Sequence, residues 1–347
     1  MPNETENFTP WRLRTIKQAR EERPPTVYTV DKYFSRGSLN IVYGAPGSLK
    51  SMLLADMCCA IAGGVDWLPG IGEGGAGIKT RLGGVLWYDY DNGTRRTDER
   101  FDALSSAPGR YLADDAPLYY VSMPQYAYSA NDVERTLYLI DLVNELQAET
   151  LVIDNLGLIT GDVEENSAQM AGVMGNLRIV AERTDAAVIV VHHQRKGGAA
   201  GGRAGDALRG HSSIEAAIDL AIQVIREPDN LGITIRSTKT RGVDVNQASA
   251  LFNYDHKAGT HDLETAWFSG VAPVRGVNPV REEIIATVQE FGEISKGRLT
   301  DLVKERVGVE GVGINSIRNW IGELTDIEKV LKVEKKGTTH VISLKNG

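Results

Sequence analysis

The chain is poor in cysteine and has no long apolar run. Its only cysteines, Cys58 and Cys59, are neighbours in sequence and fall in a predicted helix. They indicate core packing and give neither a disulfide framework nor a metal site. No apolar run approaches the roughly 18 residues needed to span a bilayer. Residues 1–10 are polar and lack the apolar core of a signal peptide. We therefore expect a cytoplasmic protein with no membrane partner.

The chain also lacks an excess of positive charge. Its net charge is −8, which argues against a surface coated for nucleic acid but leaves room for a local basic channel. An acidic protein with no nucleic-acid partner therefore remains an open alternative. The 347 residues, 42% hydrophobic and 24% charged, suffice for one large domain and a small one.

Strand-like and helix-like segments alternate over residues 36–270, which predicts an α/β domain with a mainly parallel sheet and helices on both faces. Residues 1–35 precede it as an arm, in which 10–23 could form a short helix that Pro24 and Pro25 stop. The predicted strands are 39–43, 85–90, 118–122, 151–153 and 187–192, with another strand or two within 216–237. The predicted helices are 51–62, 131–147 and 167–184.

Residues 278–347 form a second, smaller unit. Apolar spacing predicts helices at 280–291, 297–306 and 313–324, and two short strands follow near 330–333 and 340–344. Three helices and a hairpin predict a winged-helix domain. Residues 271–347 carry 12 basic and 11 acidic side chains, so this unit is nearly neutral while the rest of the chain is acidic.

A phosphate-binding loop follows the first predicted strand of the large domain. Its residues are Gly44-Ala45-Pro46-Gly47-Ser48-Leu49-Lys50-Ser51. An apolar strand before it and an apolar helix after it form the context that such a P-loop needs. Gly44 and Gly47 let backbone N–H groups face phosphate oxygens. Lys50 reaches the β- and γ-phosphates, and the Ser51 hydroxyl coordinates Mg²⁺. We therefore predict ATP and Mg²⁺ as cofactors.

Leu49 departs from the usual loop, which has glycine before the lysine. A degenerate loop that binds no nucleotide remains the alternative. We expect Leu49 to keep a negative φ, as at the start of a helix, because a side chain is then tolerated.

Carboxylates end two other predicted strands. Asp154 follows strand 151–153 at the carboxyl edge, where ligands bind in open α/β sheets, and is predicted to hold Mg²⁺ through water. Alternation places Asp89 and Asp91 on one face near the end of strand 85–90. Asp91 lies farther out and is our candidate for polarising the attacking water, with Asp89 orienting it or the metal. Solvating acids at a loop mouth are the alternative.

Strand 187–192 leads into His193, where His193 or Gln194 could sense the γ-phosphate. A metal site made of His192 and His193 is not expected, because adjacent side chains on a strand point to opposite faces.

The order GAPGSLKS, YDYDN, LVIDN, HHQRK and LRGHSS resembles the RecA-like ATPases of the RepA type, which are hexameric replicative helicases carried by plasmids and phages. The resemblance covers residues 36–256 and implies a RecA-like fold and a ring of identical subunits. It makes His193 the sensor and Arg209 an arginine finger for the neighbour's ATP, with Lys239 and Arg241 inserted into the same site. Asp91 stands where the family more often has glutamate, which shortens its reach.

A structural ion pair for Arg209 and a solvated strand edge for Lys239 and Arg241 are the alternatives to these roles. The same resemblance implies single-stranded DNA in a central pore, and the glycine-rich segment 197–210 is placed to line it. Arg195, Lys196 and Arg203 could contact phosphate there without sequence preference.

The predicted winged helix has two possible partners. Arg318 on its third helix could face a duplex groove, with Lys335 and Lys336 of the wing on phosphate. Such domains also dock replication proteins, and the near-neutral charge favours neither role.

Our leading hypothesis is therefore a ring-forming ATPase that translocates on single-stranded DNA as a helicase. A filament-forming recombination ATPase and a nucleotide-switched DNA-binding regulator are the alternatives.

Overall fold

The computed structural model describes most of the chain in two units, each with its own hydrophobic core. The described residues are 14–71, 75–125, 128–164, 167–193, 212–226, 231–243, 245–271, 279–307, 314–326, 330–336 and 339–345. Everything that follows concerns this part of the chain.

The large unit is built on a nine-stranded sheet in the order β11-β10-β9-β8-β3-β7-β6-β4-β5. The six strands from β8 to β5 are parallel, and β9, β10 and β11 continue the sheet antiparallel beyond β8. The parallel strands are β3 (Leu39–Gly44), β4 (Gly84–Asp89), β5 (Leu118–Ser122), β6 (Ala148–Asp154), β7 (Ala187–His193) and β8 (Leu220–Arg226). The antiparallel strands are β9 (Gly232–Thr240), β10 (Ala248–His256) and β11 (Leu263–Val271). The expectation of a mainly parallel α/β sheet is confirmed.

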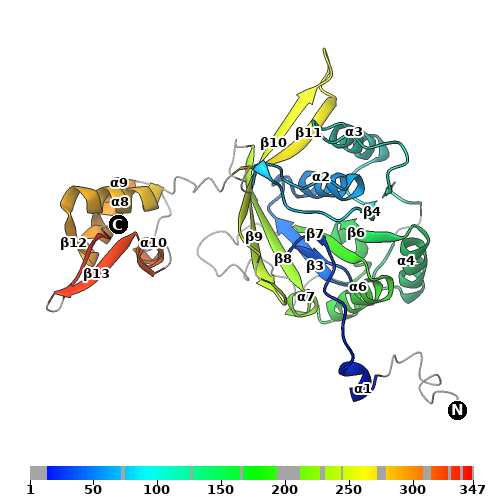
Figure 1. The fold of residues 1–347 in the computed structure, drawn as a ribbon, viewed down its shortest axis with the longest axis horizontal. Helices are drawn as coiled ribbons and strands as arrows, with labels where there is room; N and C mark the ends of the chain where they lie inside the picture. The colour runs from blue at the N-terminus through cyan, green and yellow to red at the C-terminus, as the bar shows by residue number, and fades with distance from the viewer. Residues whose placement is uncertain are drawn as a thin grey trace.

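Helices cover both faces of this sheet (Figure 1). One face carries α2 (Lys50–Gly63) and α3 (Thr94–Ser105), and the other carries α4 (Val133–Glu145), α5 (Leu156–Ile159), α6 (Met170–Thr184) and α7 (Ser212–Ala217). β3, β4 and nearly all of β6 are buried, because helices shield them from both sides. Cys58 and Cys59 are both buried on α2, as core packing requires.

Three elements of the large unit do not stand out in the sequence. α3 is mostly polar, and its buried positions form a narrow stripe that includes Phe101 and Leu104. β10 and β11 form a hairpin that is only partly buried: β11 buries alternate residues, and β10 is buried at its start and exposed at its end, so neither strand reads as an apolar run. α3 packs against β11, so the extension of the sheet curls over the helix layer.

The amino-terminal residues are partly built into the large unit. α1 (Ile16–Ala19) is shorter than the predicted helix and buries no residue. β1 (Tyr28–Val30) and β2 (Phe34–Ser35) form a small antiparallel sheet. Val30 and Phe34 from these strands are buried in the main core, so the second half of the predicted arm belongs to the body.

The carboxyl-terminal unit contains the predicted three helices and hairpin, together with one additional strand. Its elements are α8 (Pro279–Phe291), β12 (Glu293–Ser295), α9 (Lys296–Val307), α10 (Ile314–Asp326), β13 (Leu331–Lys336) and β14 (Thr339–Leu344). The strands form an antiparallel sheet in the order β12-β14-β13, and apolar residues from all the elements close a separate core. Among the described helices of the whole chain, none combines the length and apolarity of a membrane span.

A buried ion pair joins α2, α3 and β11. Arg110 Nη2 lies 2.6 Å from Asp56 Oδ1 and donates to Leu104 O at 3.1 Å. The Phe268 N–H also donates to Asp56 Oδ1, at 3.3 Å. Asp56 is fully buried and Arg110 nearly so. Removing one partner would leave the other charge uncompensated inside the protein.

We therefore expect Asp56→Ala to lower the free energy of unfolding by about 3–5 kcal/mol. The matched control is Asp66→Ala, which removes the more exposed pair between Lys79 Nζ and Asp66 Oδ2 and should cost less than about 1 kcal/mol. Denaturant unfolding of both variants checks this. Equal losses at the two positions would contradict the account.

Candidate nucleotide-binding site

The predicted phosphate loop lies at the carboxyl edge of the parallel strands, between the ends of β7 and β8. β3 leads into it and α2 leaves it, as the sequence predicts. Residues 45–47 are exposed at the apex, whereas most of α2 is buried. α2 begins without a side-chain cap and has no acidic residue in its first turn. The N–H groups at its start therefore suit a phosphate anion.

Gly44 is required by close backbone approach. A Cβ built at this position would lie 2.3 Å from Val224 O on β8 and 2.9 Å from Ser48 Oγ. Any side chain would push the loop away from β8. At the apex, Gly47 has φ +77°, which favours glycine.

The expectation for Leu49 is wrong. Its φ is +65° and its ψ is 17°, so it adopts the left-handed conformation. The usual glycine adopts this conformation without cost, whereas a side chain costs about 1–2 kcal/mol. Leu49 is half-buried and packs against the core that α2 shares with the sheet. That packing offsets part of the backbone cost.

Lys50 is buried and bonded to the loop itself. Its Nζ donates to Gly44 O at 3.1 Å, to Ala45 O at 2.9 Å and to Ser48 Oγ at 3.4 Å. Burial lowers the pKa of the Lys50 ammonium, and the carboxylates of Asp154 and Asp91 oppose that shift. A phosphate group would compete for the ammonium that these loop oxygens now hold.

Asp154 is the most unusual residue of the site. It is 0% exposed, and neither carboxylate oxygen makes a hydrogen bond of ordinary geometry to a described residue; the Ser51 hydroxyl is nearby but not well placed to donate to it. Desolvation raises the pKa of the Asp154 carboxyl to about 6, although the nearby Ser51 hydroxyl opposes the shift. Two unpaired carboxylate oxygens beside a serine hydroxyl fit a hydrated Mg²⁺ ion, which takes oxygen ligands and keeps several waters. The residues present therefore suit the predicted metal.

Asp89 organises the turn after β4. It is paired in register with Asp154 across β4 and β6 and is fully buried. Its Oδ1 accepts from the N–H groups of Asp91 at 3.0 Å and Asn92 at 2.8 Å, and its Oδ2 accepts from Thr97 Oγ1 at 3.1 Å. These bonds support the expectation that Asp89 orients Asp91.

Asp91 itself lies beyond the strand, because β4 ends at Asp89. It is exposed at the mouth of the site, and its charge influences the pKa values of both Lys50 and Asp154. The structure thus brings it close to the predicted phosphate and metal residues.

His193 reaches the same edge from β7. Gly44 and His193 are register partners across β3 and β7, so the histidine begins beside the loop. Its Nε2 lies 3.2 Å from Asn155 Nδ2, directly after Asp154. His193 is exposed whereas His192 is buried, as strand alternation requires. A polar contact thus links the predicted sensor to the strand that carries Asp154.

Lys239 and Arg241 lie near the amino ends of the parallel strands, whereas the phosphate loop lies at their carboxyl ends. Lys239 is paired with Ala221, and β9 runs antiparallel to β8, so its last residues lie near the amino ends of the parallel strands. This places them roughly 10–16 Å from Gly44 along the strand direction. Lys239 Nζ donates to Glu215 O, and Arg241 Nη2 donates to Ala216 O. Neither cation can serve the phosphate loop of its own chain.

The other predicted contacts either fall outside the described residues or belong to the carboxyl-terminal unit. Arg195, Lys196, Arg203 and Arg209 fall outside the described residues. Arg318 and Lys335 are exposed in the carboxyl-terminal unit, on α10 and β13, and Lys336 ends β13.

One contact of the site has no sequence signal. Arg226 ends β8, and its Nη1 donates to Gly47 O at 3.1 Å. The two residues are 179 positions apart, so only the alignment of β8 beside β3 brings them together. An arginine at the end of a parallel strand is too common to be a signal by itself.

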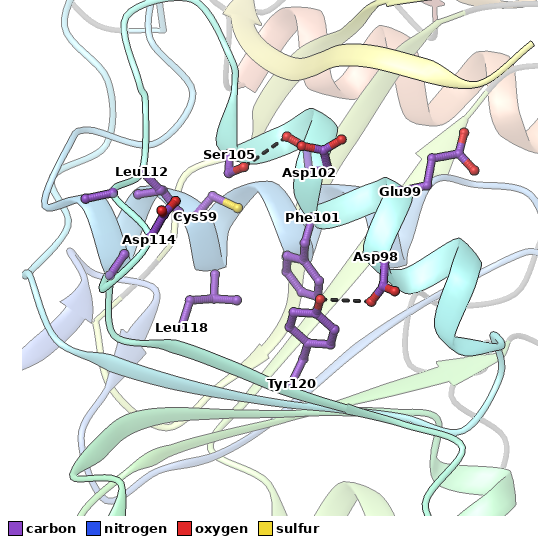
Figure 2. Close-up of a pocket in the computed structure, with 12 residues that line it drawn as sticks. Cys59, Asp98, Glu99, Phe101, Asp102, Ser105, Leu112, Asp114, Leu118 and Tyr120 are labelled. Carbon is purple, nitrogen blue, oxygen red and sulfur yellow. Dashed lines mark hydrogen bonds between the residues drawn. The ribbon is translucent and has the colours of Figure 1, made fainter. Parts of the chain in front are cut away.

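A pocket of about 460 Å³ lies away from this site, between α3, β5 and the segment that joins them (Figure 2). Its wall carries the carboxylates of Asp98, Glu99, Asp102 and Asp114, and its floor includes the stacked rings of Phe101 and Tyr120. Four carboxylates would repel a nucleotide phosphate. The phosphate loop therefore remains the candidate nucleotide site.

A phosphate loop at the carboxyl edge of a parallel sheet, with a buried carboxylate on a nearby strand, defines a P-loop nucleotide-binding domain. A family model described as an AAA domain matches residues 2–199, more than half of the 347 residues. The chain belongs to this family of P-loop ATPases, which indicates ATP binding and hydrolysis, typically with Mg²⁺. No curated protein sequence matches the chain.

The buried carboxylate gives a prediction for stability. The pKa of Asp154 is raised from 3.8 to about 6. The folded protein therefore binds this proton more tightly than the unfolded chain, and the resulting stabilisation is lost as the pH rises through about 6. Without nucleotide or Mg²⁺, Asp154→Asn should raise the free energy of unfolding by about 1–3 kcal/mol at pH 8.

The gain should shrink at pH 4.5, because the wild-type carboxyl is then largely protonated. Asp91→Asn is the matched control at an exposed neighbour and should change stability by less than about 0.5 kcal/mol. Denaturant unfolding in EDTA at both pH values is the measurement. A pH-independent gain, or a loss, would show that Asp154 is not a desolvated carboxylate.

The left-handed conformation of Leu49 gives a second prediction. Leu49→Gly and Leu49→Ala remove the same packing, but only alanine keeps the backbone cost. The glycine variant should be more stable by about 1 kcal/mol. At Met52, inside α2, the order should reverse, because alanine favours a helix interior by about 1 kcal/mol over glycine. The measurement is thermal unfolding of the four variants. If the alanine variant is more stable than the glycine variant at both positions, Leu49 does not have the left-handed conformation.

Proposed function

We propose that the protein is an ATP-driven motor that assembles as a ring, a hexamer, and translocates on single-stranded DNA as a helicase. The observation that carries the nucleotide part is Asp154, whose two unpaired carboxylate oxygens are buried beside Ser51 and the phosphate loop. A buried carboxylate without a well-formed hydrogen bond destabilises a protein, so its presence at this position favours a metal-binding role.

Each residue of the site would have its own role in ATP hydrolysis. Backbone N–H groups of 44–51 and Lys50 would hold the phosphates, and Ser51 and Asp154 would hold Mg²⁺, which neutralises the developing phosphate charge. Asp91 would orient the attacking water, with its backbone held by Asp89. His193 would sense the γ-phosphate, and its contact with Asn155 would couple it to the metal strand.

The positions of Lys239 and Arg241 support the proposed assembly. Lys239 and Arg241 occupy the edge of the sheet opposite the phosphate loop, so any role at ATP must be at a neighbour's site. A head-to-tail arrangement, in which the end of one subunit's β9 meets the next subunit's phosphate loop, is heterologous, and it would form the proposed ring if the rotation between subunits closes. Arg209 would complete the same site.

The DNA contacts follow from the chain path. β7 ends at His193, so the γ-phosphate sensor leads directly into the segment with Arg195, Lys196 and Arg203. Single-stranded DNA would bind these side chains through its phosphates. This arrangement would connect ATP hydrolysis at the sheet edge to movement of the strand.

The carboxyl-terminal unit would act as a winged helix. Its three helices pack with a three-stranded antiparallel sheet, and Arg318 on α10 and Lys335 on β13 are exposed. With Lys336, these side chains would contact duplex DNA, or a replication protein would dock on the same surface.

Two observations favour a second candidate, a nucleotide-switched DNA-binding regulator with slow turnover. Leu49 costs the loop backbone energy in its left-handed conformation. Asp91 is exposed in a loop and has a shorter side chain than glutamate. Both features would slow hydrolysis, and the winged helix would then provide the binding to duplex DNA.

The deciding experiment is steady-state ATP hydrolysis with and without single-stranded DNA. We expect stimulation by single strands and a loss of about 100-fold or more in Lys50→Ala. The control variant Lys79→Ala removes a surface lysine of the same domain and should keep full activity. If ATP hydrolysis is slow and responds to duplex DNA but not to single strands, the helicase hypothesis is rejected and the regulator is favoured.

Assembly is tested by mixing two inactive variants. Lys50→Ala subunits keep the cations at β9, and Arg241→Ala subunits keep the phosphate loop. A random mixture should recover about one quarter of wild-type activity, because half of the intact loops then face an intact neighbour. A mixture no more active than its separate components would contradict sharing of sites. Negative-stain images would distinguish a ring from a recombination-type filament.

A further inference from the structure

The end of β8 forms one wall of the phosphate loop. The carbonyl of Val224 lies where any side chain at Gly44 would have to be, and Arg226 donates to the carbonyl of Gly47 at the loop apex. The loop is therefore in contact with β8 at both its first glycine and its apex. Its shape depends on this strand as well as on β3 and α2.

Cations account for three carbonyl oxygens of the loop. Lys50 Nζ holds those of Gly44 and Ala45, and Arg226 Nη1 holds that of Gly47. A carbonyl oxygen directed at a phosphate would repel it, so the direction of the Gly47 peptide matters for binding. A guanidinium at this place also adds positive charge beside the loop.

A bound phosphate would affect the hydrogen bonds of the two cations differently. The Lys50 ammonium would leave its carbonyls to meet the β- and γ-phosphates. Arg226 approaches the apex from β8 and can keep its bond to Gly47 while the nucleotide is bound. It can therefore fix the apex in the conformation that receives phosphate.

We propose that Arg226 is a positioning residue of the nucleotide site, which holds the Gly47 peptide and thereby prepares the loop for the polyphosphate of ATP. This inference rests on the proposed binding of nucleotide at the loop. Because Arg226 would act on the part of the loop that binds phosphate, its contribution to affinity should not require the base or the ribose.

Arg236 provides a matched control. It lies on β9, the strand next to β8, and its Nε donates to Gln223 Oε1 at 2.8 Å. Both arginines are half-buried, and each donates to an oxygen of a neighbouring segment. Only Arg226 contacts the loop.

The test uses the full-length protein and two probes, Mg²⁺·ATP and inorganic tripolyphosphate, with affinities from titration calorimetry. Arg226→Gln should weaken both probes by about tenfold, as expected for losing one charged hydrogen bond. Arg226→Lys, which keeps one donor, should recover part of that loss. Arg236→Gln should leave both affinities unchanged.

A purely structural role is distinguished by the thermal midpoint without ligand. The two glutamine variants should lower this midpoint equally and slightly, while only Arg226→Gln loses affinity. Unchanged tripolyphosphate binding in Arg226→Gln, or a loss of affinity that follows the fall in midpoint in both variants, would overturn the inference. If Lys50→Ala binds both probes as well as wild type, the proposed nucleotide site itself is wrong.

Discussion

The candidate site depends on one carboxylate that is removed from water and makes no well-formed hydrogen bond to the residues that the structure describes. Burial of Asp154 raises its pKa to about 6; neither oxygen makes a well-formed hydrogen bond to a described residue, although the Ser51 hydroxyl lies close enough to oppose the shift. Such a group lowers stability, so the surrounding structure must hold it in place. β6 does so because it is buried between β4 and β7. The same burial directs the carboxylate toward Ser51 and the phosphate loop.

The surroundings of this carboxylate explain much of the rest. Asp89, the register partner of Asp154 on β4, accepts hydrogen bonds from the turn that follows β4. These bonds hold the backbone of Asp91 at the mouth of the site. Asn155 reaches His193 at the end of β7. The sheet then continues past β8 with antiparallel strands, which bring Lys239 and Arg241 to the far edge. The carboxyl edge of the parallel strands thus carries the candidate nucleotide site, and we propose that the residues at their amino ends complete the site of a neighbouring subunit.

Sequence patterns were sufficient for the parts whose signal is local. β3, the loop and α2 are contiguous, and β6 is an apolar run that ends in Asp154. Sequence patterns were insufficient for elements whose structure is determined by tertiary packing. α3 is mostly polar, and β10 and β11 are half-exposed, so none of them reads clearly. The left-handed Leu49 follows from the shape of the loop rather than from leucine's own preference. Arg226 meets Gly47 only because β8 lies beside β3.

We propose that the buried carboxylate of Asp154 supports the Mg²⁺ ion of a bound nucleotide. The most direct measurement is the affinity for ATP with Mg²⁺ and with EDTA, determined by calorimetry for wild type and Asp154→Asn. The account predicts that Mg²⁺ tightens binding to the wild type by about tenfold or more and has little effect on the variant. An equal effect of Mg²⁺ on both proteins would contradict it, and Asp154 would then need another explanation.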